Sequence, residues 1–88
     1  MVRIELKVLN RSGLHTRPAA SIVKVASKYK CEIELDKDGF VINSKSIIGV
    51  MTLAAEQGSI LYLITNGIDE KEASDEIAKL FESGFGEI

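Results

Sequence analysis

The only histidine of this 88-residue chain lies where a loop is expected to turn into a helix. It stands in the segment Gly13-Leu14-His15-Thr16-Arg17-Pro18-Ala19-Ala20. The first backbone N–H groups of a helix lack intrahelical partners, and the helix dipole adds partial positive charge, so such a boundary favours anions. An imidazole beside these donors, with the Arg17 guanidinium two residues on, can hold a phosphoryl group on nitrogen and release it again.

Two roles for His15 follow from the residues alone. Phosphoryl transfer needs an in-line nucleophile and donors for the equatorial oxygens. His15 can supply the nucleophile near neutral pH and Arg17 can bind the arriving charge, with Ser12 and Thr16 as further candidate phosphate contacts. The segment contains neither a second histidine nor a carboxylate, which disfavours a hydrolytic site built on a base and its orienting partner. The alternative is a histidine that only caps a helix or lies on the surface, and the residues alone leave both roles open.

The composition is typical of a small globular domain, with 45% hydrophobic and 27% charged residues. The net charge of −2 argues against a nucleic-acid binder that works through bulk electrostatics. The longest apolar run, residues 60–64, is too short to cross a membrane, and the alternating N-terminus indicates a strand and not a signal peptide. A single cysteine, Cys31, fits a reducing cytoplasm and gives no structural zinc cluster. We therefore expect one cytoplasmic domain over residues 1–88, without a metal or cofactor and without membrane insertion.

Hydrophobic periodicity predicts the element order β-α-β-β-α-β-α. The expected strands span residues 2–8, 31–36, 40–43 and 60–64, with an Asp38-Gly39 hairpin turn between the second and the third and the last one central in the sheet. The expected helices run from about Pro18 to Tyr29, from Ser44 or Ser46 to about Leu53, and from Asp69 to a stop at Gly84. The cap of the first helix is expected between His15 and Arg17, and Asp69 with Glu72 forms a capping-box pattern on the last.

These elements predict an α+β fold, with one mostly antiparallel four-stranded sheet and its helices on one face. That arrangement buries the apolar stripe of every helix. The pattern alone leaves the strand order open, because a ferredoxin-like fold begins with the same string of elements.

Two segments resemble motifs of the HPr family, the histidine-containing phosphocarriers of the bacterial sugar phosphotransferase system. The segment 13–20 is similar to the family's active-site motif, and Asn43-Ser44-Lys45-Ser46-Ile47-Ile48-Gly49-Val50-Met51 is similar to its regulatory-serine region, departing at Ile48, where methionine is frequent. Length and element order agree over the whole chain. The resemblance implies an open-faced sandwich with strand order 1-4-2-3. The tail Phe85–Ile88 departs from the shorter family ending, and no role is assigned to it.

The resemblance also implies a function. In the family, the residue matching His15 accepts a phosphoryl group on Nδ1 from phosphorylated Enzyme I and passes it to IIA proteins or domains of sugar permeases. The residue matching Arg17 assists the transfer. We therefore expect a monomeric carrier that is itself the phosphorylated intermediate and not a stand-alone enzyme. His15 should be exposed, with Nδ1 facing the backbone N–H of Thr16 or Arg17.

Ser46 precedes the short second helix, and serine is a favourable N-cap, so the pattern alone predicts a cap. The resemblance adds that in many low-GC Gram-positive bacteria the matching serine is phosphorylated by an ATP-dependent kinase. A serine kinase/phosphorylase and a transcription regulator would then be further partners. Many HPr proteins carry this serine without the kinase, so its presence alone does not establish regulation.

A docking surface for these partners is expected around His15. Its expected members are apolar side chains rimmed by lysines: Leu14, Ala20, Ile47, Ile48 and Met51, with Lys24, Lys28 and Lys45. Flexible apolar side chains suit a surface that docks several partners, and lysines complement acidic partner faces. Part of the trio Ile47, Ile48 and Met51 is expected to pack in the core instead.

Three other functions were weighed against the sugar phosphocarrier. A nitrogen-branch paralogue is the nearest, and the sequence hardly separates it. A purely regulatory HPr-like binding module that works through Ser46 is disfavoured by His15, because purely regulatory relatives lack the histidine. An RNA-binding or small-ligand β-α-β domain is disfavoured by the acidic balance and by the lack of sheet-face aromatics.

Overall fold

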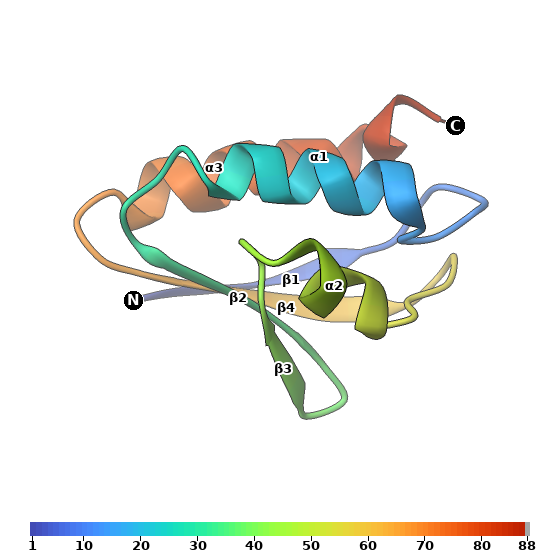
Figure 1. The fold of residues 1–88 in the computed structure, drawn as a ribbon, viewed down its shortest axis with the longest axis horizontal. Helices are drawn as coiled ribbons and strands as arrows, with labels where there is room; N and C mark the ends of the chain where they lie inside the picture. The colour runs from blue at the N-terminus through green and yellow to red at the C-terminus, as the bar shows by residue number, and fades with distance from the viewer. Residues whose placement is uncertain (88) are drawn as a thin grey trace.

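Three helices cover one face of a four-stranded antiparallel sheet in the computed structural model, which describes residues 1–87 (Figure 1). In chain order the elements are β1 Val2–Lys7, α1 Thr16–Ala26, β2 Glu32–Lys37, β3 Phe40–Asn43, α2 Ile47–Thr52, β4 Ile60–Asn66, α3 Glu70–Glu82 and a single 3₁₀ turn, η1, Gly84–Gly86. The predicted fold class and element order are confirmed. Ile88 lies outside the described residues.

The strand order in the sheet is β1-β4-β2-β3, and every neighbouring pair is antiparallel. This is the order that the family resemblance implies, so the ferredoxin-like alternative is excluded. Leu63 of the central strand β4 faces Ile4 on one side and Leu35 on the other. The apolar run therefore predicted a central strand correctly, but its burial alternates. Leu61 and Leu63 enter the core, whereas Tyr62 is only half-buried on the open face of the sheet.

The core lies between the sheet and the helices. Its largest fully buried side chains come from every layer: Ile22 of α1, Val50 of α2, Ile77 and Phe81 of α3, Ile33 and Leu35 of β2, and Leu61 and Leu63 of β4. Burying each large apolar side chain contributes roughly 1.5–3 kcal/mol before the entropy cost of ordering it. This shared core fixes the start of α1 relative to the rest of the molecule.

The turn between β2 and β3 and the start of α3 show how local patterns succeed and fail. The Asp38-Gly39 hairpin is confirmed, and the Asp36 carboxylate accepts the Gly39 N–H at 2.9 Å. The capping box predicted for α3 is wrong. Asp69 stands at the N-cap, yet its carboxylate accepts the backbone N–H groups of Lys30 and Cys31, both at 2.9 Å. These bonds, that from Lys30 first, lower the pKa of Asp69 and join the α1–β2 loop to α3.

The bounds of several elements also differ from the prediction. Helix α1 ends at Ala26 and not near Tyr29, and β2 begins one residue after Cys31. Strand β4 continues through Asn66, two residues beyond the apolar run. Its added residue Thr65 is polar but fully buried, because its hydroxyl donates to the backbone carbonyl of Glu70 at 2.9 Å. Polar residues with a tertiary partner are invisible to a hydrophobic pattern.

Candidate functional site

His15 is the N-cap of α1, within the interval that the sequence predicts. Its backbone is extended, with φ −80° and ψ −169°, and Ala19 donates the first intrahelical hydrogen bond to its carbonyl at 3.0 Å. Gly13 lets the loop before His15 pack closely against Ala55. Its φ is +71°, and an added Cβ would lie 2.4 Å from the carbonyl oxygen of Ala55. The loop before His15 is thereby pressed against the segment that follows α2, and the histidine is held at the surface.

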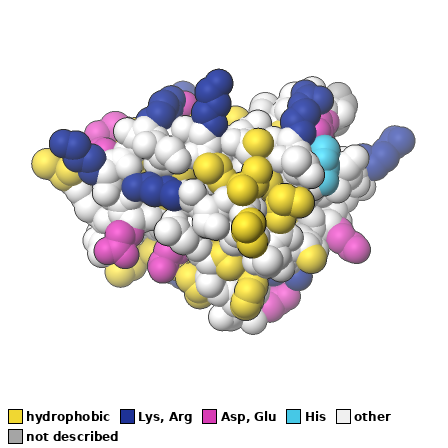
Figure 2. All heavy atoms as spheres, viewed as in Figure 1, with side chains coloured by type: hydrophobic (Ala, Val, Ile, Leu, Met, Phe, Trp, Pro, Cys, Tyr) yellow, Lys and Arg dark blue, Asp and Glu magenta, His cyan; other side chains and the backbone are white. Residues whose placement is uncertain are grey.

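The imidazole is accessible, as predicted, with 41% of its side chain exposed. Figure 2 shows this one histidine at the surface, next to a hydrophobic patch. The ring makes no capping hydrogen bond to the first turn of α1. Its Nε2 instead lies 3.1 Å from Oε1 and 3.0 Å from Oε2 of Glu87. The ring thus contacts the C-terminal segment through Nε2, which leaves Nδ1 as the nitrogen free to face the first turn.

Arg17 lies on the first turn of α1, beside the same carboxylate. Its side chain is 70% exposed, and Nη1 is 4.0 Å from Oε2 of Glu87. Ser12 and Thr16 are also exposed, and Ser12 and Arg11 line a surface pocket together with Glu87. The structure therefore brings together the charged and hydroxyl residues that the sequence singled out, and adds an anion to them.

Glu87 is the residue at this site that sequence reasoning missed. Its carboxylate is only 13% exposed and accepts a hydrogen bond at 3.0 Å from Nδ2 of Asn10, which is fully buried. The His15 hydrogen bond, the Asn10 hydrogen bond and the charge of Arg17 lower the pKa of Glu87, against the opposing effect of burial. The segment 13–20 itself holds no carboxylate, but the fold brings the Glu87 carboxylate to it.

The tail reaches His15 because Phe85 anchors it. Gly84 and Phe85 both have positive φ, +60° and +56°, which reverses the chain after α3. The left-handed region costs a non-glycine residue about 1–2 kcal/mol. Burial of the Phe85 ring, which is 8% exposed and packs edge-to-face on Phe81 at 5.0 Å, offsets that cost. The sequence pattern gave no signal of this arrangement.

Ser46 is the N-cap of α2, and its exposed Oγ accepts the Gly49 N–H at 3.1 Å. The cap prediction is confirmed. The other candidate cap, Ser44, is fully buried. Ser46 therefore caps α2 and at the same time leaves its hydroxyl exposed to solvent, where a modifying enzyme could reach it.

The expected docking surface forms only in part. Ile47, Ile48 and Met51 are 39%, 74% and 42% exposed, so the expectation that part of this trio packs in the core is wrong. Val50 and Leu53 fill the core from α2 instead. Ala20 is exposed, as predicted. Leu14 is not part of the surface, because it is 4% exposed and belongs to the core cluster.

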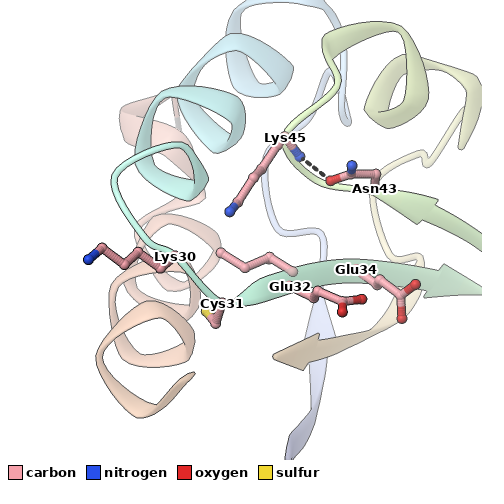
Figure 3. A pocket seen from close by; sticks show the side chains of 7 residues that line it. Lys30, Cys31, Glu32, Glu34, Asn43 and Lys45 are labelled. Carbon is pink, nitrogen blue, oxygen red and sulfur yellow. Dashed lines mark hydrogen bonds between the residues drawn. The ribbon is translucent and has the colours of Figure 1, made fainter. Parts of the chain in front are cut away.

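The lysine rim is also altered by tertiary contacts. Lys24 is exposed, but Lys28 pairs with Glu76 at 2.6 Å. Lys45 donates to the carbonyl of Tyr29 at 2.7 Å. Figure 3 shows Lys45 above a pocket that Lys30, Cys31, Glu34 and Asn43 also line, at the end of α1 opposite to His15. Two of the three lysines thus take part in contacts that tie the α1–β2 loop to α3 and to the segment between β3 and α2.

Residues 1–87 lack two features that define other classes of protein. No helix among them is long and apolar enough to cross a bilayer. No group of three or more histidine, cysteine or acidic side chains in this range is arranged to hold a metal ion.

Comparison with known proteins agrees with the fold and the site. Residues 2–83 match the family model described as "PTS HPr component phosphorylation site". The phosphocarrier protein HPr of Treponema pallidum is 47% identical over 87 residues, 99% of each chain. The HPr-like protein Crh of Halalkalibacterium halodurans is 43% identical, over 93% of this chain and 98% of its own.

Solved structures extend the likeness. HPr-C-His from Thermoanaerobacter tengcongensis matches with a TM-score of 0.96 at 42% identity, covering 100% of this chain and 99% of its own. A structure described as an HPr dimer from the same organism has a TM-score of 0.80 at 42% identity, over 99% of this chain and 100% of its own. The strand order, the histidine at the start of α1 and these matches together make the chain a member of the HPr family.

Proposed function

We propose that this chain is a phosphocarrier that accepts a phosphoryl group from phosphorylated Enzyme I on Nδ1 of His15 and passes it to IIA proteins or domains. The observation that carries the proposal is the exposed imidazole at the N-cap of α1, with Arg17 on the first turn. We also propose that residues 1–88 form one domain, that the chain is a monomer in the cytoplasm, and that it works without a bound cofactor.

The first turn of α1 offers two backbone donors to a phosphoryl group on His15. The N–H groups of Thr16 and Arg17 have no intrahelical acceptor, because the first intrahelical hydrogen bond is donated by Ala19. Pro18, between them and Ala19, has no N–H to donate. The exposed Arg17 guanidinium can turn from Glu87 to the phosphoryl oxygens, because 4.0 Å is a loose ion pair. Backbone donors and a guanidinium would then share the incoming charge.

The apolar patch of α2 supports docking of large partners. Ile47, Ile48 and Met51 expose hydrophobic surface on one short helix that packs against α1. We assign to this patch, together with Ala20, the contact with Enzyme I and the IIA acceptors, and Lys24 its charged edge. Ser12 and Thr16 remain candidate contacts for the phosphoryl group itself.

We propose as a second function that phosphorylation of Ser46 regulates the first. Likeness to the HPr-like protein Crh and the exposed position of Ser46 favour it. A phosphate at the N-terminus of α2 is compatible with the helix dipole, and its oxygens can replace Oγ as acceptors for the Gly49 N–H. The dianion would sit beside Ile47, where Enzyme I is proposed to dock. A serine kinase/phosphorylase and a transcription regulator would be the additional partners.

The decisive experiment is to incubate the chain with Enzyme I and phosphoenolpyruvate and to map the phosphate. We expect a single acid-labile phosphate on His15, transferable to a IIA acceptor. The variant His15→Ala is the matched control. A phosphate that forms equally in His15→Ala, or none in the native chain, overturns the proposal. Comparing sugar IIA and nitrogen-branch acceptors in the same assay separates the two branches, and size-exclusion chromatography tests the monomer.

A further inference from the structure

We propose that Glu87 is a positioning residue for His15, which holds the proton on Nε2 so that Nδ1 keeps the lone pair that attacks phosphorus. This inference rests on the proposed phosphocarrier function and deepens it. The contact joins residues at the two ends of the chain. It uses a side chain from the tail to which the sequence pattern gives no role.

The geometry fixes the position of the proton. Both oxygens of Glu87 lie within 3.1 Å of Nε2. An ionised carboxylate can only accept hydrogen bonds, so the favourable partner is an Nε2–H donor. A neutral imidazole carries one N–H, and its other nitrogen, Nδ1, is then the unprotonated one. The same logic orients histidines that act as nucleophiles, bases or metal ligands elsewhere.

The carboxylate is held in place independently of His15. Asn10, fully buried in the loop after β1, donates through Nδ2 to Glu87 at 3.0 Å and to the carbonyl of Gly13 at 2.7 Å. The buried ring of Phe85 fixes the chain two residues earlier. The result is a relay in which a buried amide orients a carboxylate and the carboxylate orients the imidazole.

The relay keeps the transfer balanced without moving a proton. As Nδ1 forms its bond to phosphorus, the bond from phosphorus to the donor protein breaks, and its electron pair stays with the donor. The ring then carries the phosphoryl group on Nδ1 and the proton on Nε2, so it is an imidazolium, which the Glu87 carboxylate stabilises. In the outgoing step a nucleophile of the IIA acceptor forms the new bond to phosphorus as the N–P bond breaks. The electron pair of the N–P bond returns to Nδ1, and the ring is neutral again with Nε2–H unchanged.

Two cations share the surroundings of Glu87. Arg17 lies 4.0 Å from Oε2, and Arg11 lines the same surface pocket. When Arg17 turns to the phosphoryl oxygens, Glu87 is left to the imidazolium. The opposing possibility is that the carboxylate mainly repels the incoming phosphoryl group, in which case removing its charge would speed the transfer. The two effects have opposite signs and can be told apart.

The test compares the native chain with Glu87→Gln and Glu87→Ala. The matched control is Glu82→Gln, which removes the same charge from an exposed position on α3. The first measurement is the ¹⁵N NMR spectrum of His15 in the unphosphorylated proteins, at a pH where the ring is neutral. We expect a single Nε2–H tautomer in the native chain and in Glu82→Gln, and a mixture of tautomers in Glu87→Ala.

The second measurement is the rate of transfer from phosphorylated Enzyme I to the chain, the step in which the imidazolium forms. Loss of one charge-assisted hydrogen bond predicts a decrease of roughly tenfold in Glu87→Gln and Glu87→Ala, with Glu82→Gln unchanged. A tail that only stabilised the fold would leave the His15 tautomer unchanged in Glu87→Ala.

Two results would overturn the positioning role: an unchanged tautomer in Glu87→Ala, or faster transfer in Glu87→Gln. Failure of the proposed function has a different signature. In that case the native chain takes no phosphate from Enzyme I, while the NMR comparison still reports on the Glu87–His15 contact.

Discussion

The starts of α1 and α2 use the same helix position in opposite ways. Each N-cap residue is polar, extended and exposed. At α2 the Ser46 side chain turns toward its own helix and accepts the Gly49 N–H. At α1 the His15 ring makes no cap hydrogen bond, and its Nε2 contacts Glu87 instead. One N-cap is closed by its own side chain, and the other leaves the first-turn N–H groups open for the phosphoryl group that we propose His15 carries.

The largest expected effect at these two helix starts comes from replacing His15. Replacing it by asparagine supplies a good cap for α1 but no nucleophile. We expect His15→Asn to lose all phosphate acceptance from Enzyme I while its melting temperature stays at or above the native value. Measurable phosphorylation of His15→Asn, detected by mass spectrometry, would show that another residue carries the phosphate.

Arg17 tests the charge at the same helix start. Arg17→Ala should leave circular dichroism unchanged, because the side chain is 70% exposed. The rate of transfer from Enzyme I should fall, since losing a charge-assisted phosphate contact is worth roughly 1.5–3 kcal/mol, or one to two orders of magnitude. Arg17→Lys should recover part of the rate, because an ammonium lacks the planar fork. Equal rates in native and Arg17→Ala proteins would contradict the assigned role.

Ser46 tests whether the second helix start is also regulatory. Ser46→Asp keeps an N-cap acceptor and adds a charge beside Ile47, so α2 should persist. We expect roughly tenfold weaker acceptance from Enzyme I, because a new anion must be desolvated or must face an acidic partner. Ser46→Asn is the control, a good cap without the charge. Normal acceptance in Ser46→Asp would leave Ser46 as a cap alone.

The sequence predicts this site as far as local rules reach. Gly13, His15 and Pro18 mark a loop-to-helix boundary, and the helix does begin there. Ser46 is a cap because serine at that position favours one. The strand order could be predicted only from the family resemblance. Hydrophobic periodicity indicates which face of a strand is buried, but it does not indicate which strand lies beside it.

What the sequence could not predict depends on contacts between distant segments. Leu14 is expected at the surface because it flanks the histidine. It is buried instead, because the loop that carries it packs closely against the segment after α2. Asp69 was assigned to its own helix and instead holds the α1–β2 loop. Glu87 lies 72 residues from His15 in the chain, so no local pattern connects them. Long-range polar contacts have no signature in a single sequence.

The smallest expected effect is the loss of stability at acid pH that comes from the Glu87 carboxylate in the tail. It separates the His15 cap, which contacts this carboxylate, from the Ser46 cap. The pKa of Glu87 is lowered from its ordinary value of 4.5 in the folded chain, chiefly by the His15 hydrogen bond. A lowered folded pKa contributes stability above the unfolded value, and that stability is lost as the pH falls through the folded value.

Between about pH 6 and about pH 3 the native chain should therefore lose more of its melting temperature than Glu87→Gln does. The amide resonance of Gly86 should move in the same pH range, while that of Gly49, bonded to the uncharged Ser46 hydroxyl, should not. Identical acid profiles for the native chain and Glu87→Gln would mean that the carboxylate does not hold the tail at His15.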